Sequence, residues 1–472
     1  MSVYKIFFLI GLVTWLGCTT PSMLVQINKQ PVLPSSFTSS DTSSSKDSIH
    51  WTQISNDTVL KGLIDTAIQN NNEIQIAFQK IELARSQRQF TKGSLLPQVG
   101  IGTSGSLRKF GLYTMDGAGN IVTEITPGKF IPIDLPDMYL GVQSSWEIDI
   151  RGRLKNLDKA ALARFFASQE GLKFVMNSLA TDVALSYYEL LALDNELIVI
   201  RENAKKEKEA LEFIKAQKET GKINELAVQQ FTAQYYNLIV IEKEVLQNIR
   251  KEENKLNFLL GRYPQKISRS RESLYSAQNL ISKSISSNVL QNRADIKAAE
   301  WKLKAAKFDI NAAKAAFYPT FNLNMGYGFQ AFNANYWLRS PESIAYNVAG
   351  NLMAPLVNRS AIKAQFNAAK SNQIESMLQY QQSILNAYVD VVNDFTEITH
   401  LEEIKQFTEN KANAYRQAVE SSFDLYKAAR VPYIDVLLSQ QNALQTNIEL
   451  ILIHKRSKIA TVKLYKNLGG AW

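Results

Sequence analysis

Two hydrophobic periodicities alternate along the chain, one typical of coiled coils and one typical of β-strands. From residue 154 to residue 220 there is no Pro, and apolar residues recur about every 3.5 positions, which predicts a coiled-coil seam. At 1.5 Å per residue, this stretch predicts a rod roughly 100 Å long. Only Ser186 and Glu207 interrupt the seam, which otherwise consists of Leu172, Met176, Leu179, Val183, Leu190, Leu193, Leu197, Ile200, Ala204, Leu211 and Ile214.

Four shorter stretches alternate apolar residues with small or polar ones, as β-strands with two unlike faces do. They form two predicted hairpins, at about residues 97–150 and about residues 319–357. Residues 108–136, inside the first hairpin, are rich in Gly, Pro and Asp and are predicted to be a long loop. The polar faces of the strands carry Gln143, Glu147, Asn322, Asn324, Gln330 and Asn347.

The length and the two faces of these strands favour a membrane β-barrel. Each pattern covers about 8–12 residues, close to what a tilted strand needs to cross a bilayer. The apolar face would then meet lipid, and the polar residues above would line a wet interior. Tyr139, Tyr318 and Trp337 lie near strand ends, where aromatic side chains suit the membrane interface. A soluble antiparallel sheet packed on helices gives the same alternation and remains an alternative.

These elements occur twice, in the same order. Glu73–Pro97 and Asp295–Pro319 carry the same switch from helix to strand, displaced by 222 positions. Self-similarity of this kind indicates a duplicated unit. We therefore predict an internal two-fold repeat, with a first repeat over residues 57–264, a Ser-rich connector over 265–287 and a second repeat over 288–472.

Each repeat also contains a pair of long helices joined by a short turn. The turns are predicted at T-G-K-I-N (220–224) and A-A-R-V-P (428–432). A shift of 208 positions superposes the helices that follow the turns and places Gly261 on Gly469. Gly at these two positions predicts the ends of the returning helices.

The N-terminus has the features of an export signal. Residues 1–17 contain Lys5, an apolar run and a small residue before Cys18, which is the single Cys of the chain. This arrangement resembles a bacterial lipoprotein signal, so residues 1–17 are a predicted signal peptide and Cys18 the lipidated, palmitate-bearing first residue of the mature chain. An ordinary signal peptide or an N-terminal anchor are the alternatives. Elsewhere no run of 18 or more apolar residues predicts another membrane helix.

The segment that follows is predicted to lack its own secondary structure. Residues 18–56 are rich in Ser, Thr and Pro and have too little apolar surface to order themselves, so they indicate a tether or a strap over a neighbouring surface. Asp57 is the predicted N-cap of a helix, and this helix is expected to continue to Pro97.

Charge and chemistry argue against other classes of function. The net charge of +9 is spread along the chain without a basic block containing aromatic residues, so nucleic-acid binding is not expected. His50, His400 and His454 are scattered, and only His400 has acidic neighbours, as in a surface ion pair. No catalytic set, metal site or cofactor site is predicted.

Three segments resemble a known family. R-A-D-I-K-A-A-E-W (293–301), continuing to Leu323, is similar to its central motif, with Ala294 in place of the usual Pro; W-E-I-D-I-R-G-R-L-K (146–155) is similar to its passage from strand to helix; and Y-K-N-L-G-G-A-W (465–472) is similar to its C-terminus. The chain thereby resembles the outer membrane factors of bacterial tripartite efflux and secretion systems, the TolC-like channels, and within them the lipoprotein branch that partners resistance–nodulation–division pumps.

The resemblance implies an α+β membrane protein that works as a homotrimer. Four strands per chain cannot close a barrel, whereas three chains would give a 12-stranded one, continued by a long antiparallel α-helical coiled-coil barrel in the periplasm. The protein would be lipid-anchored in the bacterial outer membrane, with a periplasmic adaptor protein and an inner-membrane pump as partners. It would be a passive exit duct for drugs, other small toxic compounds or metal ions, and not an enzyme.

The resemblance also implies that the periplasmic tip is the closed end of the duct. Opposite charges near a constriction can hold it shut, so the second turn is the predicted gate and the first turn the predicted contact of the adaptor. A solvated surface charge is the alternative for each of these residues. The gate candidates are Asp424, Lys427, Arg430, Tyr433 and Asp435, and the adaptor-contact candidates are Lys218, Glu219, Gly221, Lys222 and Glu225.

Two other functions remain open at this point. Within the same class, the chain could be the outer membrane channel of a type I protein-secretion system. In a different class, it could be a lipid-anchored coiled-coil protein without a pore, which the strand hairpins disfavour.

Overall fold

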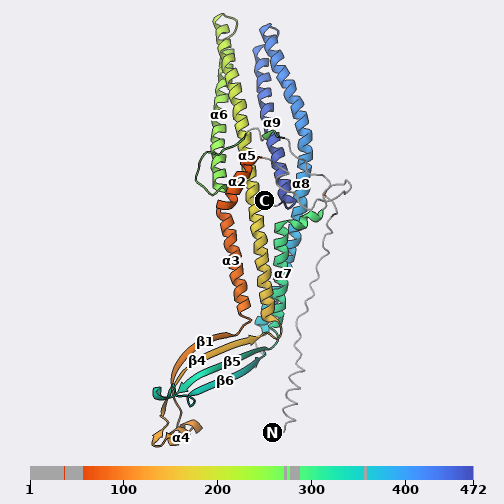
Figure 1. Ribbon diagram of the computed structural model, residues 1–472. Helices are drawn as coiled ribbons and strands as arrows, with labels where there is room; N and C mark the ends of the chain where they lie inside the picture. Colours follow the sequence, from red (N-terminus) through yellow and green to blue (C-terminus); the bar gives the residue numbers. More distant parts are fainter. Residues whose placement is uncertain are drawn as a thin grey trace. The chain divides into compact units, whose positions relative to one another are not determined.

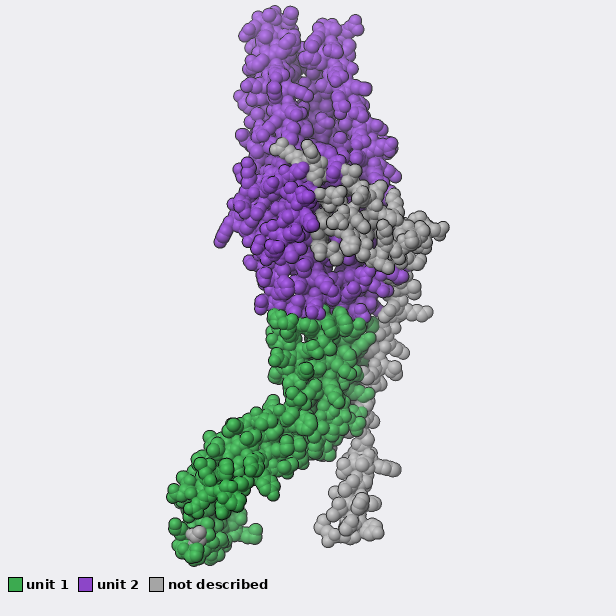
Figure 2. Space-filling view, in the orientation of Figure 1, with its two compact units in different colours: residues 1–27, 82–166, 301–378 green, residues 28–81, 167–300, 379–472 purple. Residues whose placement is uncertain are grey.

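The computed structural model describes residues 34, 37, 57–270, 274–276, 287–355 and 359–470. The predicted signal peptide, Cys18 and all of the predicted tether except Pro34 and Phe37 lie outside these residues. The chain divides into two compact units, which are coloured in Figure 2. Unit 1 contains residues 82–166 and 301–378, and unit 2 contains residues 28–81, 167–300 and 379–472, each within the described part of the chain.

Unit 1 contains one antiparallel sheet of four strands (Figure 1). The strands are β1 (Gln98–Lys109), β4 (Asp134–Ile148), β5 (Thr320–Ala331) and β6 (Ile344–Met353). Their order is β1-β4-β5-β6, so the two predicted hairpins are joined through β4 and β5. β1 and β6 are the edges of this sheet and leave unpaired backbone groups, which is the feature a barrel removes.

The prediction of a loop over residues 108–136 was wrong. This segment contains α4 (Met115–Val122) and a small hairpin of β2 (Glu124–Thr126) and β3 (Lys129–Phe130). Thr114 caps α4, because its hydroxyl accepts a hydrogen bond from the backbone N–H of Gly117 at 3.1 Å. A helix of 8 residues is too short to show a hydrophobic period among so many turn-forming residues.

The single helix predicted between Asp57 and Pro97 is two helices, α2 (Thr58–Asn70) and α3 (Asn72–Gly93). Asp57 is the N-cap, as predicted, and its carboxylate accepts from the backbone N–H groups of Val59 and Leu60. The chain breaks at Asn71, whose side chain accepts from Glu73 N at 2.7 Å and donates to the carbonyl of Leu259 at 2.9 Å. The hydrogen bond from Asn71 to the distant carbonyl of Leu259 thus accompanies the break in a stretch that the local helical pattern predicts to be continuous.

The long helices agree with the coiled-coil prediction. They are α5 (Arg153–Glu219), α6 (Glu225–Leu259), α8 (Arg359–Lys427) and α9 (Tyr433–Asn467), and the turns between them are the five-residue segments 220–224 and 428–432. From Leu179 to Ile214 every predicted seam position of α5 is buried, including Ser186 and Glu207. The remaining elements are η3 (Ser287–Asn292), α7 (Ala294–Ala315) and η4 (Ala334–Tyr336). No described helix is both long and apolar enough to span a bilayer.

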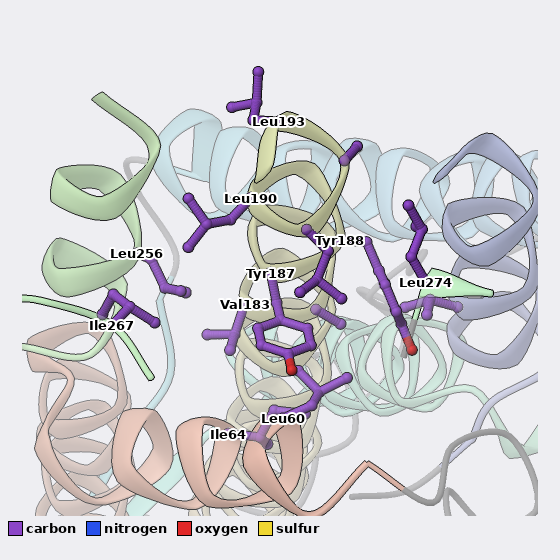
Figure 3. Packing of buried hydrophobic residues seen from close by; sticks show 14 of the residues in the cluster. Leu60, Ile64, Val183, Tyr187, Tyr188, Leu190, Leu193, Leu256, Ile267 and Leu274 are labelled. Atoms are coloured by element: carbon purple, nitrogen blue, oxygen red, sulfur yellow. The ribbon is translucent and has the colours of Figure 1, made fainter. Parts of the chain in front are cut away.

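The largest core of unit 2 forms around Tyr187 of α5. Figure 3 shows its ring directed toward Leu60 and Ile64 of α2. Its hydroxyl donates to Asp57 Oδ2 at 2.8 Å and accepts from the backbone N–H of Ser270 at 3.3 Å. The ring therefore packs against apolar side chains while its hydroxyl is hydrogen-bonded. Burial raises the pKa of Tyr187 beyond its ordinary range.

Polar and aromatic contacts attach residues of the predicted connector and tether to unit 2. Arg269 donates to the buried carboxylates of Asp194 and Glu253, the latter at 2.6 Å. Phe37 is buried and stacks on Tyr388 with ring centroids 5.4 Å apart. Phe37 thereby packs against α8, and the interpretation of the whole segment as a strap stays a prediction.

The duplication is visible at corresponding junctions of the two repeats. Asn71 donates to the carbonyl of Leu259, and Arg293, displaced by the same 222 positions as the sequence repeat, donates to the carbonyl of Asn467 at 3.1 Å. In each repeat the residue before a helix therefore holds the end of the returning helix. The first repeat uses a neutral amide for this contact, and the second uses a guanidinium.

Candidate functional site: the sheet faces and the two helical turns

One face of the sheet in unit 1 is apolar and exposed. Ile101, Val142, Tyr327 and Tyr346 pair in register across all four strands. Their exposed fractions are 82%, 41%, 59% and 79% in the single chain. A row of large apolar side chains facing away from the protein is costly in water, and it is what the lipid face of a barrel requires.

The opposite face is polar and hollow. A cavity of about 830 Å³ lies over it and is lined by Gln143, Asn324, Gln330 and Asn347, four of the six residues predicted to face a wet interior. Gln330 Nε2 donates to Asp137 Oδ1 at 2.8 Å across β4 and β5. Amide side chains dominate this face, which keeps it wet without a strong charge preference.

The first turn, residues 220–224, is stabilised by its own side chains. Gly221 has φ +74°, a conformation that glycine adopts without a steric penalty, and Asn224 caps α6 by accepting from Ala227 N at 3.2 Å. Lys218 forms an ion pair with Glu225 across the turn. The hydrogen bond from Lys218 lowers the pKa of Glu225 below its ordinary value. The predicted residues Glu219 and Lys222 are exposed here.

The second turn, residues 428–432, repeats the backbone of the first without these side-chain contacts. Ala429 takes the place of Gly221 and has φ +54°, the one non-glycine residue with positive φ in the described chain. Pro432 stands at the N-cap of α9 and makes no side-chain capping bond. Lys427 lies over the ring of Phe423, with Nζ 4.3 Å from its centroid. The predicted gate residues Asp424, Arg430 and Asp435 are exposed, and none has an ion pair within the described residues.

Neutral side chains join the two helix pairs near the turns. Tyr426 Oη donates to Gln217 Oε1 at 2.9 Å, and Gln441 Nε2 donates to Gln234 Oε1 at 2.9 Å. Between these contacts the hydroxyl of Tyr433 donates to Gln230 Oε1. Beneath them, one apolar cluster contains Leu211, Ile214, Ala227, Val228, Phe231 and Leu437.

The structure therefore brings together a different set of residues from the one predicted. Of the gate candidates, Tyr433 contacts the first helix pair, whereas no charged candidate from one turn pairs with a charged candidate from the other among the described residues. Sequence reasoning missed Gln217, Gln230, Gln234, Tyr426 and Gln441. The available signal was the recurrence of Tyr and Gln beside the apolar seam near both turns, positions where a side chain can reach a neighbouring helix pair.

The described residues contain no group of three or more His, Cys, Asp and Glu side chains that could hold a metal ion. His400 Nδ1 lies 3.8 Å from Glu403 Oε2, one helical turn away on an exposed face. That distance and exposure fit the surface ion pair expected from the sequence.

Comparison with known proteins identifies relatives over most of the chain. The family model described as "outer membrane efflux protein" matches residues 63–262 and 285–470. The chain is 26% identical over 426 residues to the probable outer membrane lipoprotein SilC of Salmonella typhimurium, covering 89% of this chain and 88% of SilC. It is also 26% identical over 423 residues to the cation efflux system protein CusC of Escherichia coli strain K12, with coverage of 89% and 88%.

A solved structure of CusC has the same fold. It superposes with a TM-score of 0.81 at 24% sequence identity, covering 95% of this chain and 100% of that one. The fold with four antiparallel strands and long helices per chain is therefore a TolC-like fold, in agreement with the sequence-based resemblance.

Proposed function

Because the chain belongs to the outer membrane efflux protein family, we propose that three copies of it close a 12-stranded barrel through the outer membrane. The family makes it an outer membrane efflux channel, a transport protein and not an enzyme. The observation that supports closure by three chains is the sheet of unit 1, which has two free edges and an exposed apolar face. Four strands in lipid would leave both edges unpaired, and 12 strands are enough to surround a wet duct.

We propose further that the second turn forms the gate. Asp424, Arg430 and Asp435 have no ion pair within the described chain and are exposed, so they are available to the neighbouring copies around a threefold axis. Charges that converge on a narrow duct can close it and can select the sign of the ions that pass. Lys427 and Tyr433 would position this turn, Lys427 over Phe423 and Tyr433 on the first helix pair.

The first turn suits a contact with a periplasmic adaptor. Lys218, Glu219, Gly221, Lys222 and Glu225 are exposed, and the turn's conformation is stabilised locally, so it can present a fixed surface to a helical partner. The adaptor would connect the channel to an inner-membrane pump that supplies the energy.

Cys18 would fix the mature chain to the membrane through lipid, as expected from its signal-like surroundings and as the name of SilC suggests for that relative. To test this, radiolabelled palmitate should enter the wild-type chain and not Cys18→Ser.

The cargo proposed first is a metal cation, because CusC is named a cation efflux protein. Drugs and other small toxic compounds remain the wider class.

The decisive experiment combines mass and conductance. The purified protein should have the mass of three chains in a neutral detergent and should form conducting channels in a planar bilayer. A monomer that leaves the bilayer ion-tight would contradict the proposal.

The gate has its own test in the same bilayer. Asp424→Asn with Asp435→Asn should raise single-channel conductance several-fold, because the charges that hold the constriction are removed. Glu219→Gln, an exposed acid on the first turn, serves as the matched control and should leave conductance unchanged. Equal conductance in all three proteins would reject the assignment of these gate residues.

A further inference from the structure

Unit 2 contains a cavity with a volume of about 390 Å³. All four long helices contribute to its walls: α5, α6, α8 and α9. Its volume lies within the range of small-molecule sites. The cavity is large enough for an organic molecule and much larger than a single bare ion needs.

Glu207 of α5 is the buried charge in this cavity. It is 3% exposed, and its Oε1 has no hydrogen-bond partner among the described residues. Gln440 of α9 lines the same cavity, and its buried Oε1 also has no partner. Buried acceptors are almost always satisfied, because an unsatisfied one costs the free energy of its lost hydration. Two such oxygens in one cavity indicate a missing hydrogen-bond donor.

The other lining residues of the cavity indicate which chemical group should carry that hydrogen-bond donor. Val199, Leu238, Val419 and Leu444 supply apolar surface beside the two oxygens. A carboxylate, an amide oxygen and an aliphatic wall together match an alkylammonium ion, whose head donates three hydrogen bonds and whose chain is apolar. A metal ion fits less well, since the described residues contain no cluster of three potential His, Cys, Asp or Glu ligands.

We propose that this cavity binds a small organic cation, with the ammonium group donating to Glu207 Oε1 and Gln440 Oε1 and the aliphatic part against Leu238 and Leu444. The proposal goes beyond the efflux function and does not depend on it. Glu207 is one of the two residues that interrupt the apolar seam, and it is the charged one. A ligand of this kind accounts for a carboxylate at a position where packing alone favours an aliphatic side chain.

The other charged groups around the cavity are at its rim. Glu202 and Lys206 lie on α5 and Arg416 and Glu420 on α8, all four exposed, whereas α6 and α9 contribute neutral amides. Burial raises the pKa of Glu207 to about 7. Below this value the carboxyl group is neutral and binds a cation weakly, so affinity should increase between pH 6 and pH 8, where an alkylammonium stays protonated.

The test uses hexylammonium as the probe and isothermal titration calorimetry of the full-length protein in a maltoside detergent at pH 8. Wild-type protein should bind hexylammonium, and hexanol and hexanoate should bind at least tenfold more weakly. Glu207→Gln, which keeps the shape of the side chain, should weaken hexylammonium binding at least tenfold. The matched control Glu202→Gln, an exposed acid at the rim, should change it less than twofold.

A second variant keeps Glu207 and reduces the volume of the cavity. Ala443→Leu places three extra carbon atoms on the cavity wall and should also weaken binding at least tenfold. Three results would overturn the proposal: no binding of hexylammonium to wild-type protein, equal binding to Glu207→Gln, or equal binding of hexanol. The first would mean that water alone fills the cavity, and the last that it selects apolar chains without regard to charge.

Discussion

The two helical turns have the same backbone geometry and different side-chain contacts. In the first, Lys222 N bonds to Gln217 O and Gly221 has positive φ; in the second, Arg430 N bonds to Leu425 O, and Ala429 has positive φ. The first turn adds a side-chain capping bond and an exposed ion pair, and the second has neither within the described chain. The two copies thus share a backbone geometry, whereas a side-chain capping bond stabilises only the first, and the weaker capping of the second turn would suit the gate proposed there.

The junctions at Asn71 and Arg293, where each repeat holds the end of its returning helix, show the opposite difference, because the second repeat has more polar contacts there than the first. In the second repeat Arg293 is buried and makes contacts with Asp295 at 2.8 Å, with Asp390 at 3.8 Å and with the carbonyl of Asn467. In the first repeat Asn71 makes two neutral hydrogen bonds at the corresponding place. The second repeat is therefore more strongly held at its junction and less strongly held at its turn.

The largest expected effect is at these junctions. Arg293→Ala should lower the free energy of unfolding by about 3–5 kcal/mol, because it removes the buried guanidinium that donates to the Asp295 carboxylate and to the helix-end carbonyl of Asn467. Asn71→Ala should cost only about 1–2 kcal/mol. Thermal unfolding of both variants in one detergent, at one protein concentration, measures the difference. Similar losses in the two variants would remove the proposed asymmetry between the junctions.

The next effect concerns Glu207, whose corresponding position in the second repeat is Tyr415. Its pKa is raised to about 7 by burial, so the folded protein binds a proton more tightly than the unfolded chain, and stability falls as pH rises from about 4.5 to about 7. Glu207→Gln should therefore stabilise the protein by about 1–3 kcal/mol at pH 8 and by much less at pH 5. Melting curves at the two pH values would show this, and an equal gain at both would contradict it.

A smaller effect separates the two turns directly. Gly221→Ala should cost about 1 kcal/mol, because it places a Cβ in the left-handed region, and Ala429→Gly should recover a similar amount at the second turn. Reciprocal shifts in melting temperature would sharpen the comparison. If Ala429→Gly were destabilising, the positive φ at this position would not be a source of strain.

The smallest expected effect is at the exposed ion pair of the first turn. Lys218→Ala should leave the melting temperature unchanged within error, since solvent screens Lys218 and Glu225 and both side chains are mobile in water. The same variant should reduce binding of the adaptor if the first turn is its contact. A clear loss of thermal stability would show that the pair, and not Gly221 and Asn224, maintains the turn.

Much of this architecture could be predicted because it depends on period and repetition. The seam of α5, the turns at 220–224 and 428–432, and the two faces of the strands follow from side-chain spacing alone. Contacts between residues distant in sequence could not be predicted in this way. The break at Asn71 depends on a carbonyl of Leu259, 188 positions away, and the link between the turns uses Tyr426 and Gln217, 209 positions apart.

By itself, the sequence determined the duplicated plan, the coiled-coil helices, the amphipathic strands and the family resemblance, because each is recorded in the local order of apolar and polar residues. Only the tertiary structure decided which polar side chains meet. It paired Tyr433 with Gln230, and it placed Glu207 in a cavity where Oε1 has no hydrogen-bond partner among the described residues. Periodicity specifies the face on which a side chain lies, whereas the identity of its partner depends on how separate helices pack.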